Sequence, residues 1–536
     1  MGQNFVTAER DQLFLLPPDA REWLPGRHLA WAVLEAAGEL DMAPFTAWYR
    51  ADGQGRPAYH PRLMVGLVMY CYCKGIRSSR AIEMATWDDV GARVICGNLH
   101  PDHTTVHRFV THHEQAVKGL LVASLAACAK QGLVSVDVVA GDGTKVKASA
   151  SMAAGATAEQ LEIEIAELEA LLAAEVEAWF AQAQAADAAE DALFGDDGGD
   201  GPGPGGGPGT LARLTDKIVR RRKAKAKLDA EQAAPRQHAQ AEHASKIARL
   251  EARAAARRAD AERLAAAADA KVADYQRRAA QKAASGSRKR PDGRVPVPAD
   301  RHIVVRRARQ ALAAAEQALA AAQATPAAAA PPANPPKANT TDPASRVMPA
   351  KKGGFDQLRN VQVLAGKHQV IYAIDTHDNP TDTGALHPLL ERARANLDTA
   401  GIPGPIAKAL FDAGYASEDN FTTACEPELY VAITKEARQT GRLRDGHKPA
   451  TMKDSWQQMA ARLDTREGKA LYRQRAGIIE PVFAQLFGRL GRDLHYRDTK
   501  IDLELHLWAA SHNLLKAIRA QARRTARIPA GPPAVT

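Results

Sequence analysis

The sequence predicts a mixed α/β core that is preceded by an all-helical domain and interrupted by a long helical insertion. Three observations support this fold class. Residues 1 to about 125 carry apolar residues at helical spacing, and residues 156 to 310 form a long, alanine-rich and charged stretch. Elsewhere, segments with strand character alternate with amphipathic helices, which indicates a mixed sheet with helices packed against it.

The first part of the chain, residues 1–130, is predicted to be a helical DNA-binding domain. Segments such as AWAVLEAAGEL, PRLMVGLVMYCYCKG and SRAIEMATWDDVGARVIC carry apolar residues at helical spacing, with basic residues between them. Several short helices of this kind resemble a helix-turn-helix module. The helix that begins near His103 would then enter a groove of DNA through His103, His107 and Arg108. A plain helical bundle with surface histidines is the alternative.

Residues 131–155 contain the apolar run VSVDVVAG and are predicted to begin the α/β core. The insertion that follows, residues 156–335, is predicted to be a coiled coil with flexible linkers at 195–209 and 325–339. Apolar residues recur at steps of three and four along its first helix, as in a helix seam: Leu161, Ile165, Leu168, Leu172, Val176 and Trp179.

The two halves of the insertion carry opposite charge. Residues 157–200 contain 13 Asp and Glu and no Lys or Arg, whereas residues 211–310 contain 27 Lys and Arg against 11 Asp and Glu. An acidic helix and a basic helix favour an antiparallel hairpin, because opposite charges then flank the seam. We interpret the excess positive charge as the surface of a projecting arm that lies on DNA phosphates. A solvated helix without a partner is the alternative.

The remainder of the core is predicted in residues 336–536. Residues 360–377 are typical of a β-hairpin that turns at Ala365-Gly366-Lys367, and residues 428–434 of another strand. The segment PIAKALFDAGYAS is interpreted as a strand that ends in a turn, and GALHPLLERARANL as an amphipathic helix. A long helical block is predicted to begin near Leu471.

Composition restricts the class of partner. A net charge of +9 and a pI of about 9.2 favour a polyanion such as nucleic acid. The N-terminus does not have the pattern of a signal peptide, and the apolar run LMVGLVMYCYC is shorter than the roughly 20 residues of a membrane span. Five cysteines provide no disulfide framework. We therefore expect a cytoplasmic, nucleoid-associated protein that binds DNA and no membrane.

Three carboxylates occupy comparable places. Asp142 and Asp412 each end an apolar run, and Glu480 precedes Pro481, either as the leading residue of a helix or at a kink. Neighbouring strand ends in one sheet are about 5 Å apart, so the acids can converge, and three close carboxylates need a cation to neutralise them. Oxygen ligands suit Mg²⁺ or Mn²⁺, and two such ions about 4 Å apart can hold a phosphodiester for hydrolysis.

Each acid on its own has a simpler interpretation, because Asp-Gly after a strand is common in turns. If the aspartate in GDG is catalytic, Gly141 and Gly143 would let the backbone pass close to metal and DNA. The residues alone do not exclude other acids of the same kind, which are Asp137, Asp375, Asp378 and Asp382.

Four longer blocks occur in order along the chain. The first combines DQLFLLPPDAREWLPGRHLAWAV, GRPAYHPRLMVGLVMYCYCKGIRSSRAIE and HPDHTTVHRF, and the second is GDGTKVKASAS. The third extends from TTDPASRVMPAKKGGFDQLRNVQV through THDNPTDTGALHPLLERA to FDAGYAS, and the fourth from LYRQRAGIIEPVFAQLF to HLWAASHNLLK. Together they cover nearly everything outside residues 156–335. They resemble the DDE transposases of bacterial insertion sequences, in the IS-eleven-eighty-two-like group.

This resemblance implies a ribonuclease-H-like catalytic core in which Asp142, Asp412 and Glu480 bind two Mg²⁺ or Mn²⁺ ions. It favours these residues over Asp375. It also implies that Tyr472, Arg475 and Glu480 form a Tyr-x-x-Arg…Glu signature, with the arginine near DNA phosphate or the carboxylates.

Members of the group commonly carry a lysine seven residues after the glutamate, a position that Phe487 occupies in this chain. Arg489 could contact DNA there instead. Lys145 and Lys147 would alternate on one face of the strand, within reach of phosphate.

The expected function is that of a transposase. It would bind terminal inverted repeats with its N-terminal domain, hydrolyse phosphodiesters and direct the new 3′-OH onto target DNA. Because two ends must be held together, a homodimer on DNA is expected. The alternatives are a catalytically decayed or repurposed transposase that acts as a DNA-binding protein, and a different nuclease on the same fold.

Overall fold

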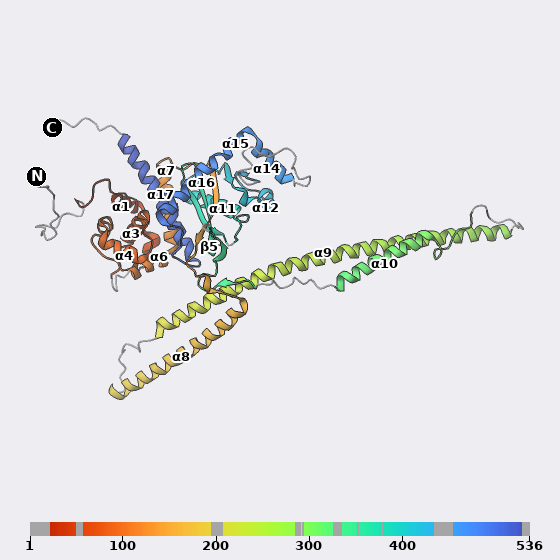
Figure 1. The fold of residues 1–536 in the computed structure, drawn as a ribbon, viewed down its shortest axis with the longest axis horizontal. Helices are drawn as coiled ribbons and strands as arrows, with labels where there is room; N and C mark the ends of the chain where they lie inside the picture. The colour runs from red at the N-terminus through yellow and green to blue at the C-terminus, as the bar shows by residue number, and fades with distance from the viewer. Residues whose placement is uncertain are drawn as a thin grey trace, which may run out of the picture. The chain divides into compact units, whose positions relative to one another are not determined.

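The computed structural model describes residues 22–49, 57–194, 207–284, 291, 294–324, 335–350, 353–377, 379–433 and 454–527. Its contacts divide the chain into two compact units (Figure 1). Unit 1 comprises residues 1–155 and 339–536, and unit 2 comprises residues 156–338. Within the described residues, no helix is long and apolar enough to cross a membrane.

Unit 1 begins with short helices: α1 (Leu29–Glu39), α2 (Ala43–Thr46), α3 (Pro61–Lys74), α4 (Ser79–Asp88), α5 (Val90–Cys96), α6 (His103–His112) and α7 (Glu114–Lys130). Helix α3 starts where Pro61 occupies the first turn and the His60 ring accepts a hydrogen bond from the Arg62 amide. It ends at Gly75, whose φ of 86° lies in the left-handed region that favours glycine. Nearly all of α3 is buried, so it is the central helix of this group.

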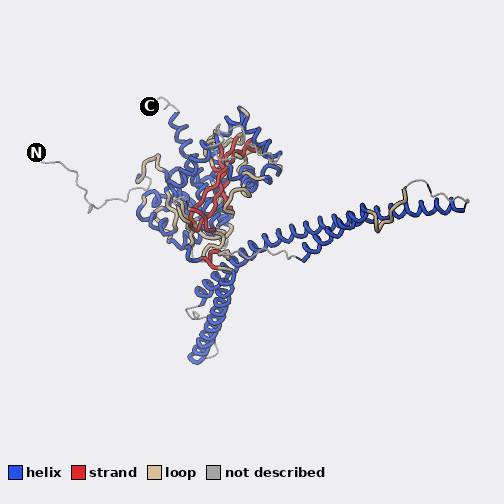
Figure 2. The backbone as a smooth tube through the Cα atoms, turned by 45° about the vertical axis from the view of Figure 1, so that its right-hand side comes forward, coloured by secondary structure: helices blue, strands red, loops and turns tan. Residues whose placement is uncertain are grey.

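The strands of the described part of unit 1 form a six-stranded mixed sheet in the order β4-β5-β1-β7-β8, with β6 also paired to β5. Strand β5 is antiparallel to β1, β4 and β6, whereas β1, β7 and β8 are parallel. Figure 2 shows these strands surrounded by the helices of the unit. The bounds are β1 (Val138–Lys147), β4 (Arg346–Pro349), β5 (Phe355–Gly366), β6 (Ile371–His377), β7 (Lys408–Phe411) and β8 (Glu428–Val431).

Helices pack on both faces of this sheet. Alternate strand residues point to opposite faces. Ala140 and Leu410 belong to a core with α16 (Gln474–Leu490), α17 (Lys500–Arg527) and the N-terminal helices. Val139 and Phe411 belong to a core with α11 (Leu386–Thr399). The remaining elements are η2 (Met152–Ala154), β2 (Gly155–Ala156), β3 (Ala338–Asn339), η3 (Ala413–Tyr415), α12 (Glu418–Thr422), α14 (Asp454–Asp464) and α15 (Arg466–Tyr472).

The N-terminal helices therefore share a hydrophobic core with the sheet. A buried ion pair lies in the same region. The guanidinium of Arg77, between α3 and α4, lies 3.1 Å from Glu504 Oε1 of α17 and donates to the Asp493 carbonyl at 2.6 Å. The predicted boundary near residue 130 thus falls inside one compact unit.

Several predicted elements differ from the structure in their limits. The hairpin turn closes at Gly366–Val370, later than expected, because the Gly366 amide donates to the Val370 carbonyl. The strand within 405–417 is confined to β7, and 428–431 forms β8, whereas residue 434 lies outside the described residues. Of the predicted linkers, 195–206 and 325–334 lie outside the described residues.

Parts of the predicted linkers have regular structure. Gly207 begins helix α9, and Ala338–Asn339 form β3. The predicted limits of the two flexible linkers were therefore wrong at these positions. Pairing with β2 stabilises the extended backbone of Ala338–Asn339.

Unit 2 contains α8 (Ala158–Phe194), α9 (Gly207–Ala284) and α10 (Ile303–Ala324). Helix α8 is antiparallel to the first part of α9, and α10 is antiparallel to a later part (Figure 1). Ion pairs join both antiparallel pairs of helices: Arg221 of α9 lies 2.5 Å from Glu164 of α8, and Arg258 of α9 lies 2.6 Å from Glu316 of α10. The pairing of α9 with α10 was not predicted. The predicted seam of α8 is buried at Leu161, and its other five positions are half-buried.

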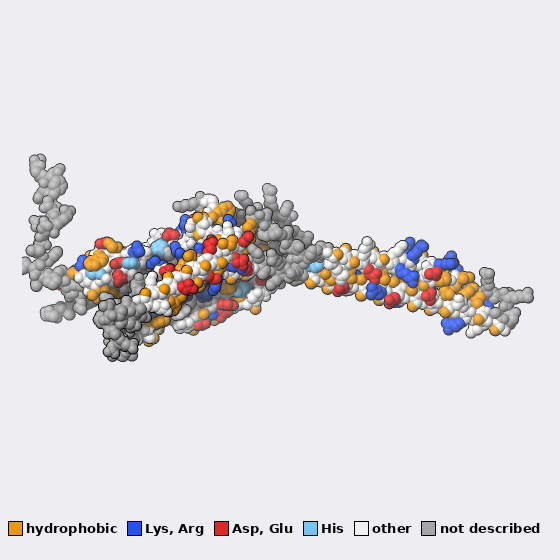
Figure 3. Space-filling model, turned by 90° about the horizontal axis from the view of Figure 1, so that it is seen from below, with side chains coloured by type: hydrophobic (Ala, Val, Ile, Leu, Met, Phe, Trp, Pro, Cys, Tyr) orange, Lys and Arg blue, Asp and Glu red, His pale blue; other side chains and the backbone are white. Residues whose placement is uncertain are grey.

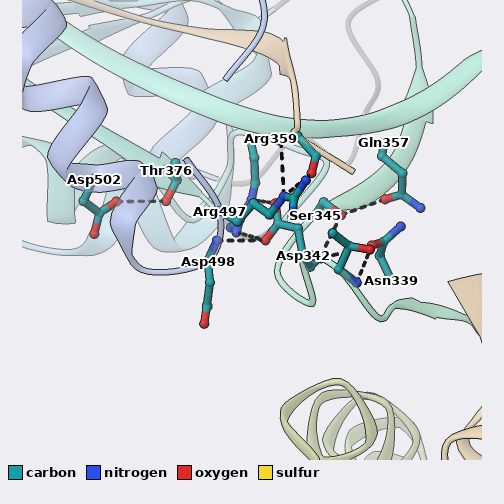
Figure 4. Close-up of polar contacts among 11 residues, drawn as sticks. Asn339, Asp342, Ser345, Gln357, Arg359, Thr376, Arg497, Asp498 and Asp502 are labelled. Atoms are coloured by element: carbon teal, nitrogen blue, oxygen red, sulfur yellow. Dashed lines mark hydrogen bonds and ion pairs between the residues drawn. The ribbon is translucent and has the colours of Figure 1, made fainter. Parts of the chain in front are cut away.

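A buried polar cluster fixes the chain where it returns to unit 1 after the insertion (Figure 4). Asp342 and Arg359 form an ion pair at 2.6 Å, with 0% and 4% of their side chains exposed. The amide of Asp498 also donates to Asp342. Ser345 donates to the side chain of Gln357 on β5. These contacts join the returning segment to β5 and to the turn before α17.

We expect Arg359→Met to destabilise unit 1 by about 3 to 5 kcal/mol, because it leaves the buried Asp342 carboxylate without its charge partner. The matched control is Lys130→Met, which removes an exposed ion pair with Glu39 and should cost no more than about 1 kcal/mol. Urea unfolding followed by circular dichroism measures both. Equal midpoints for the two variants would contradict a structural role for this ion pair.

Candidate active site

The site is built on two adjacent parallel strands. Ala140 of β1 and Leu410 of β7 are partners in register. Asp142 and Asp412 each follow two residues later, so alternation directs both side chains to the same face of the sheet. This is the face covered by α16.

The sequence suggested that Asp142 ends a strand, but the structure places it elsewhere. It lies in the middle of β1, which continues to Lys147 because β5 supplies backbone partners along this whole stretch. The sequence GDG is therefore extended strand and not a turn. The parallel pairing of β1 with β7 ends at Ala140, so Asp142 has no backbone partner on β7.

The Asp142 carboxylate is electrostatically strained. The pKa of Asp142 is raised to about 7, chiefly by burial, next by the neighbouring charge of Asp412 and least by the charge of Asp382. Arg475 and the Gly143 amide act in the opposite direction, the latter through a hydrogen bond of 2.8 Å to Asp142 Oδ1. The site thus favours a bound proton or cation over two bare charges.

Arg475 reaches Asp142 from helix α16. Its side chain is almost fully buried, and its Nη1 lies 3.5 Å from Asp142 Oδ2. Tyr472, three residues earlier, is half-buried and packs against the core between α16 and the sheet. The structure thus brings Arg475 to the carboxylates.

Asp412 starts the short 3-10 helix η3. Its Oδ1 accepts a hydrogen bond from the Gly414 amide at 2.9 Å, which holds the carboxylate at the end of β7. Tyr415 follows, is fully buried and packs its ring against Phe411. The turn that presents Asp412 is therefore anchored from within the core.

Glu480 is placed differently. It is exposed within α16, and α16 begins at Gln474, so neither Glu480 nor Pro481 leads a helix. Arg475 of the same helix contacts Asp142. The place of Glu480 in the site stays a prediction.

Asp382 is the acid that sequence reasoning did not select. Its Oδ1 accepts hydrogen bonds from Asn360 Nδ2 at 2.8 Å and from Gln362 Nε2 at 2.7 Å. The sequence offered no signal that distinguished it from Asp375, which instead forms an ion pair with Arg392. Asp137 is exposed, and Asp378 lies outside the described residues.

The two glycines beside Asp142 are also accounted for. A Cβ atom on Gly141 would lie 2.2 Å from the Phe411 ring, and one on Gly143 would lie 2.5 Å from Asp382 Oδ1. The Phe411 ring leaves no room for a side chain at position 141, and the ends of the Asp382 and Gln362 side chains lie close to position 143.

The predicted DNA-contacting residues near the site differ in their exposure and in their partners. Lys145 is half-buried on β1, and Lys147 is exposed and forms an ion pair of 2.8 Å with Asp356. Arg489 is turned toward Ser511, and burial lowers the pKa of its guanidinium. Arg489 is therefore half-buried against α17, and its contact with DNA stays a prediction.

The predicted DNA-contacting residues of α6 lie on one helix but differ in exposure. His103 Nδ1 lies 2.8 Å from Glu83 Oε2, so this histidine joins the start of α6 to α4. The His107 ring stacks on Tyr496, with ring centroids 5.9 Å apart. Arg108 is exposed.

Two of the acids offer oxygen ligands that suit a divalent cation. No group of three or more His, Cys, Asp or Glu side chains in the described part of the chain is arranged as a metal site. The chemistry of the donors does fit, because Asp142 and Asp412 are hard oxygen ligands whose mutual repulsion a cation would relieve. These two residues could hold such an ion.

The raised pKa of Asp142 predicts a pH effect on stability. Its folded pKa lies above the ordinary value of 3.8, so between about pH 4 and pH 7 the folded metal-free protein binds a proton that the unfolded chain releases. The contribution of Asp142 to the free energy of unfolding therefore falls as pH rises. In EDTA, Asp142→Asn should gain stability relative to the native sequence between about pH 5 and pH 8. The urea unfolding midpoints of the variant and the native sequence, at about pH 5 and pH 8, measure this gain. A difference between the two midpoints that is the same at both pH values would contradict the prediction.

Comparison with known families agrees with the fold. Residues 18–112 match the family described as Transposase domain (DUF772), and residues 334–514 match the family described as Transposase DDE domain. No curated protein and no solved structure matches the chain. The second family implies a ribonuclease-H-like fold, with which the mixed sheet and its helices are compatible, and its members generally use divalent metal ions. The chain belongs to the DDE transposases of the insertion-sequence type.

Proposed function

We propose that this transposase binds the ends of its own insertion sequence, hydrolyses phosphodiesters there and joins the new 3′-OH to target DNA. We further assign it to the IS-eleven-eighty-two-like group. The observation that carries the proposal is the pairing of Asp142 and Asp412 on one face of the sheet, with Arg475 beside them. This is the electrostatic environment that phosphodiester cleavage by bound metal requires.

In this proposal, Asp142 and Asp412 hold Mg²⁺ or Mn²⁺, in a site for two ions, and Glu480 contributes from α16. The bound ions would activate water and stabilise the charge on the leaving 3′ oxygen. Arg475 compensates part of the negative charge at Asp142 and fixes its Oδ2, so the carboxylate keeps its orientation before DNA arrives. The anchored turn after β7 does the same for Asp412.

Recognition of the ends is assigned to the N-terminal helices. Helix α4 packs on α6, as in a helix-turn-helix arrangement, and α6 carries His103, His107 and Arg108. Arg108 is the best placed for DNA because it is exposed, whereas His103 pairs with Glu83. Lys145, Lys147 and Tyr472 remain candidates for contacts nearer the cleavage site.

The helices of unit 2 are proposed to lie along DNA phosphates. Figure 3 shows Lys and Arg side chains together with acidic ones on the hairpin of α9 and α10. Arg249, Arg253 and Arg257 recur every four residues and are exposed, so they form a basic stripe on one side of α9. Such a stripe fits the regular phosphate spacing of a duplex without reading its sequence.

Transposition requires both ends of the element in one complex, so we propose that the protein acts as a homodimer on DNA. A second candidate function is a catalytically decayed transposase that still binds DNA. It is favoured by Phe487, which packs against Phe483 and Arg492 at the position where members of the group commonly carry a lysine.

We expect Asp142→Ala to lower strand cleavage by about a thousandfold or more, since metal-ion stabilisation is worth several kcal/mol. Binding to the element's ends should stay unchanged. The matched control is Asp137→Ala, an exposed acid before the same strand, which should cleave normally. Cleavage of labelled end DNA in Mn²⁺ and gel-shift binding measure the two activities.

Three other outcomes separate the alternatives. Metal-dependent cleavage that persists in Asp142→Ala rules out this assignment of the aspartate. End binding without cleavage by the native sequence supports a decayed transposase. Nicking without strand-transfer products indicates a nuclease.

We expect the triple substitution Arg249→Gln, Arg253→Gln and Arg257→Gln to weaken DNA binding equally for end and unrelated sequences. The slope of log affinity against log salt concentration should decrease by about 2 to 3, because each lost phosphate contact contributes about 0.9. The control is Arg263→Gln, whose side chain already pairs with Asp260 within the helix. An unchanged slope would show that this stripe does not contact phosphate.

A further inference from the structure

A large cavity opens beside helix α6 in the N-terminal part of unit 1. Its volume is about 810 Å³, which lies within the range of ligand-binding pockets in proteins. Its walls come from α6, from the residues that follow α2 and from residues 57–59 before α3. Neither Asp142 nor Asp412 lines it. The aromatic and imidazole side chains in its lining are those of Trp48, Tyr49, Tyr59, Phe109, His112 and His113.

Ring packing fixes the inner wall of this cavity. The rings of Phe45 and Phe109 stack with their centroids 5.8 Å apart, and His113 lies against Phe109 at 4.8 Å. Tyr49 stacks on His113 at 5.7 Å, and its hydroxyl lies 3.4 Å from His113 Nε2. Phe45, Phe109 and His113 are buried, so Tyr49 is held against the core of the helices. The aromatic wall is therefore formed before any ligand binds.

Trp48 is the lining residue that core packing does not explain. It is 67% exposed, whereas tryptophan is highly buried on average. Its ring meets the rings of His112 and His113 edge to face, with centroids 6.1 and 6.2 Å apart. These contacts position the indole and leave most of it in solvent at the cavity. A planar aromatic ligand that stacks on the indole would bury this apolar surface.

The charged residues at the cavity favour nucleic acid over other planar ligands. Arg108 and His112 are exposed and lie one turn apart on α6, so both face the cavity. Asp102 also lines it, but its carboxylate caps α6 by accepting hydrogen bonds from the Thr105 amide at 2.8 Å and hydroxyl at 3.0 Å. An arginine at the rim disfavours a cationic ligand, which aromatic cages otherwise bind. A base on Trp48 with its phosphate near Arg108 would use both kinds of group.

The base in question has to be unpaired. In a duplex, each base is paired and stacked between its neighbours, so a side chain can cover its face only after the base leaves the stack. Of the three α6 residues that the sequence singled out for DNA contact, only Arg108 lines the cavity. DNA that is held at Arg108 would therefore lie directly beside the exposed indole of Trp48.

We propose that this cavity binds one unpaired nucleobase of DNA, stacked on Trp48 and enclosed by Tyr49 and Tyr59, while Arg108 contacts the adjoining phosphate. This inference rests on the proposed binding of the element's ends by the N-terminal helices. The ligand is a base that has lost its partner, as in a bulge, a frayed end or a distorted duplex. Stacking accepts any base, because every base has a flat aromatic face.

The test compares the binding of two kinds of DNA duplex to the full-length protein by fluorescence anisotropy. Both carry the end sequence of the element, and one kind has a single unpaired thymine, placed at successive positions in a series. The ratio of the two affinities cancels contacts with paired DNA, including those of the basic stripe on α9. The native protein should prefer at least one duplex of the series. Trp48→Ala should lower this ratio by about fivefold or more, the effect of losing one stacked base.

Two variants are the matched controls. Trp48→Phe keeps an aromatic ring and should keep most of the preference for the unpaired thymine. Trp87→Ala removes a second exposed tryptophan, which stacks on His100 outside the cavity, and should leave the ratio unchanged. Urea unfolding midpoints establish that each variant is folded, and they should equal that of the native protein because Trp48 is exposed.

The outcomes distinguish the cavity from end binding. If the native protein prefers no duplex of the series, or if Trp48→Ala keeps the preference, the role of the cavity is overturned and the proposed end binding stands. Arg108→Gln should weaken the binding of both kinds of duplex. If this variant binds both as the native protein does, the proposed contact of α6 with DNA is overturned.

If Trp48→Ala does not fold, photocrosslinking of the native protein replaces the affinity measurement. The unpaired thymine is exchanged for 5-iodouracil, which crosslinks under light to aromatic side chains that stack on it. Crosslinks to Trp48, Tyr49 or Tyr59 support the proposal. Crosslinks that are confined to other parts of the chain overturn it.

Discussion

The central constraint on this protein is the close approach of two carboxylates, Asp142 and Asp412, in a site where burial already disfavours charge. Two such groups repel each other, and folding must overcome this repulsion before any cation is present. The fold overcomes this repulsion by holding the backbone of both aspartates in fixed positions. The parallel pairing of β1 and β7 sets the spacing, and Arg475 offsets part of the charge from α16.

Other features follow from this constraint. The glycines on both sides of Asp142 and after Asp412 leave space for Phe411 and Asp382, so the acids can be packed closely without backbone distortion. The long insertion between β1 and β5 is tolerated because the returning chain is fixed by the buried Asp342–Arg359 pair. A sheet that carries repelling charges needs firm anchors on both sides of such an insertion.

Much of this could be predicted from the sequence, and the failures have physical reasons. Apolar periodicity located most helices, and the step pattern of α8 identified its seam, because both depend on local spacing. Asp142 was mistaken for a strand end because GDG has turn composition, and the pairing with β5 that keeps it extended is a long-range contact. Asp382 could not be distinguished from its neighbours because its partners, Asn360 and Gln362, lie on another strand. The inward orientation of Arg489 likewise depends on tertiary packing.

The most direct test of the account is whether Asp412 contacts a metal ion during DNA cleavage. In an Asp412→Cys variant, a thiolate replaces a hard oxygen ligand, and Mg²⁺ binds thiolate poorly whereas Mn²⁺ accepts it more readily. The account predicts that the variant does not cleave end DNA in Mg²⁺ and regains cleavage in Mn²⁺. Full activity of the variant in Mg²⁺, or the same loss in both metals while the native protein uses both, would contradict it.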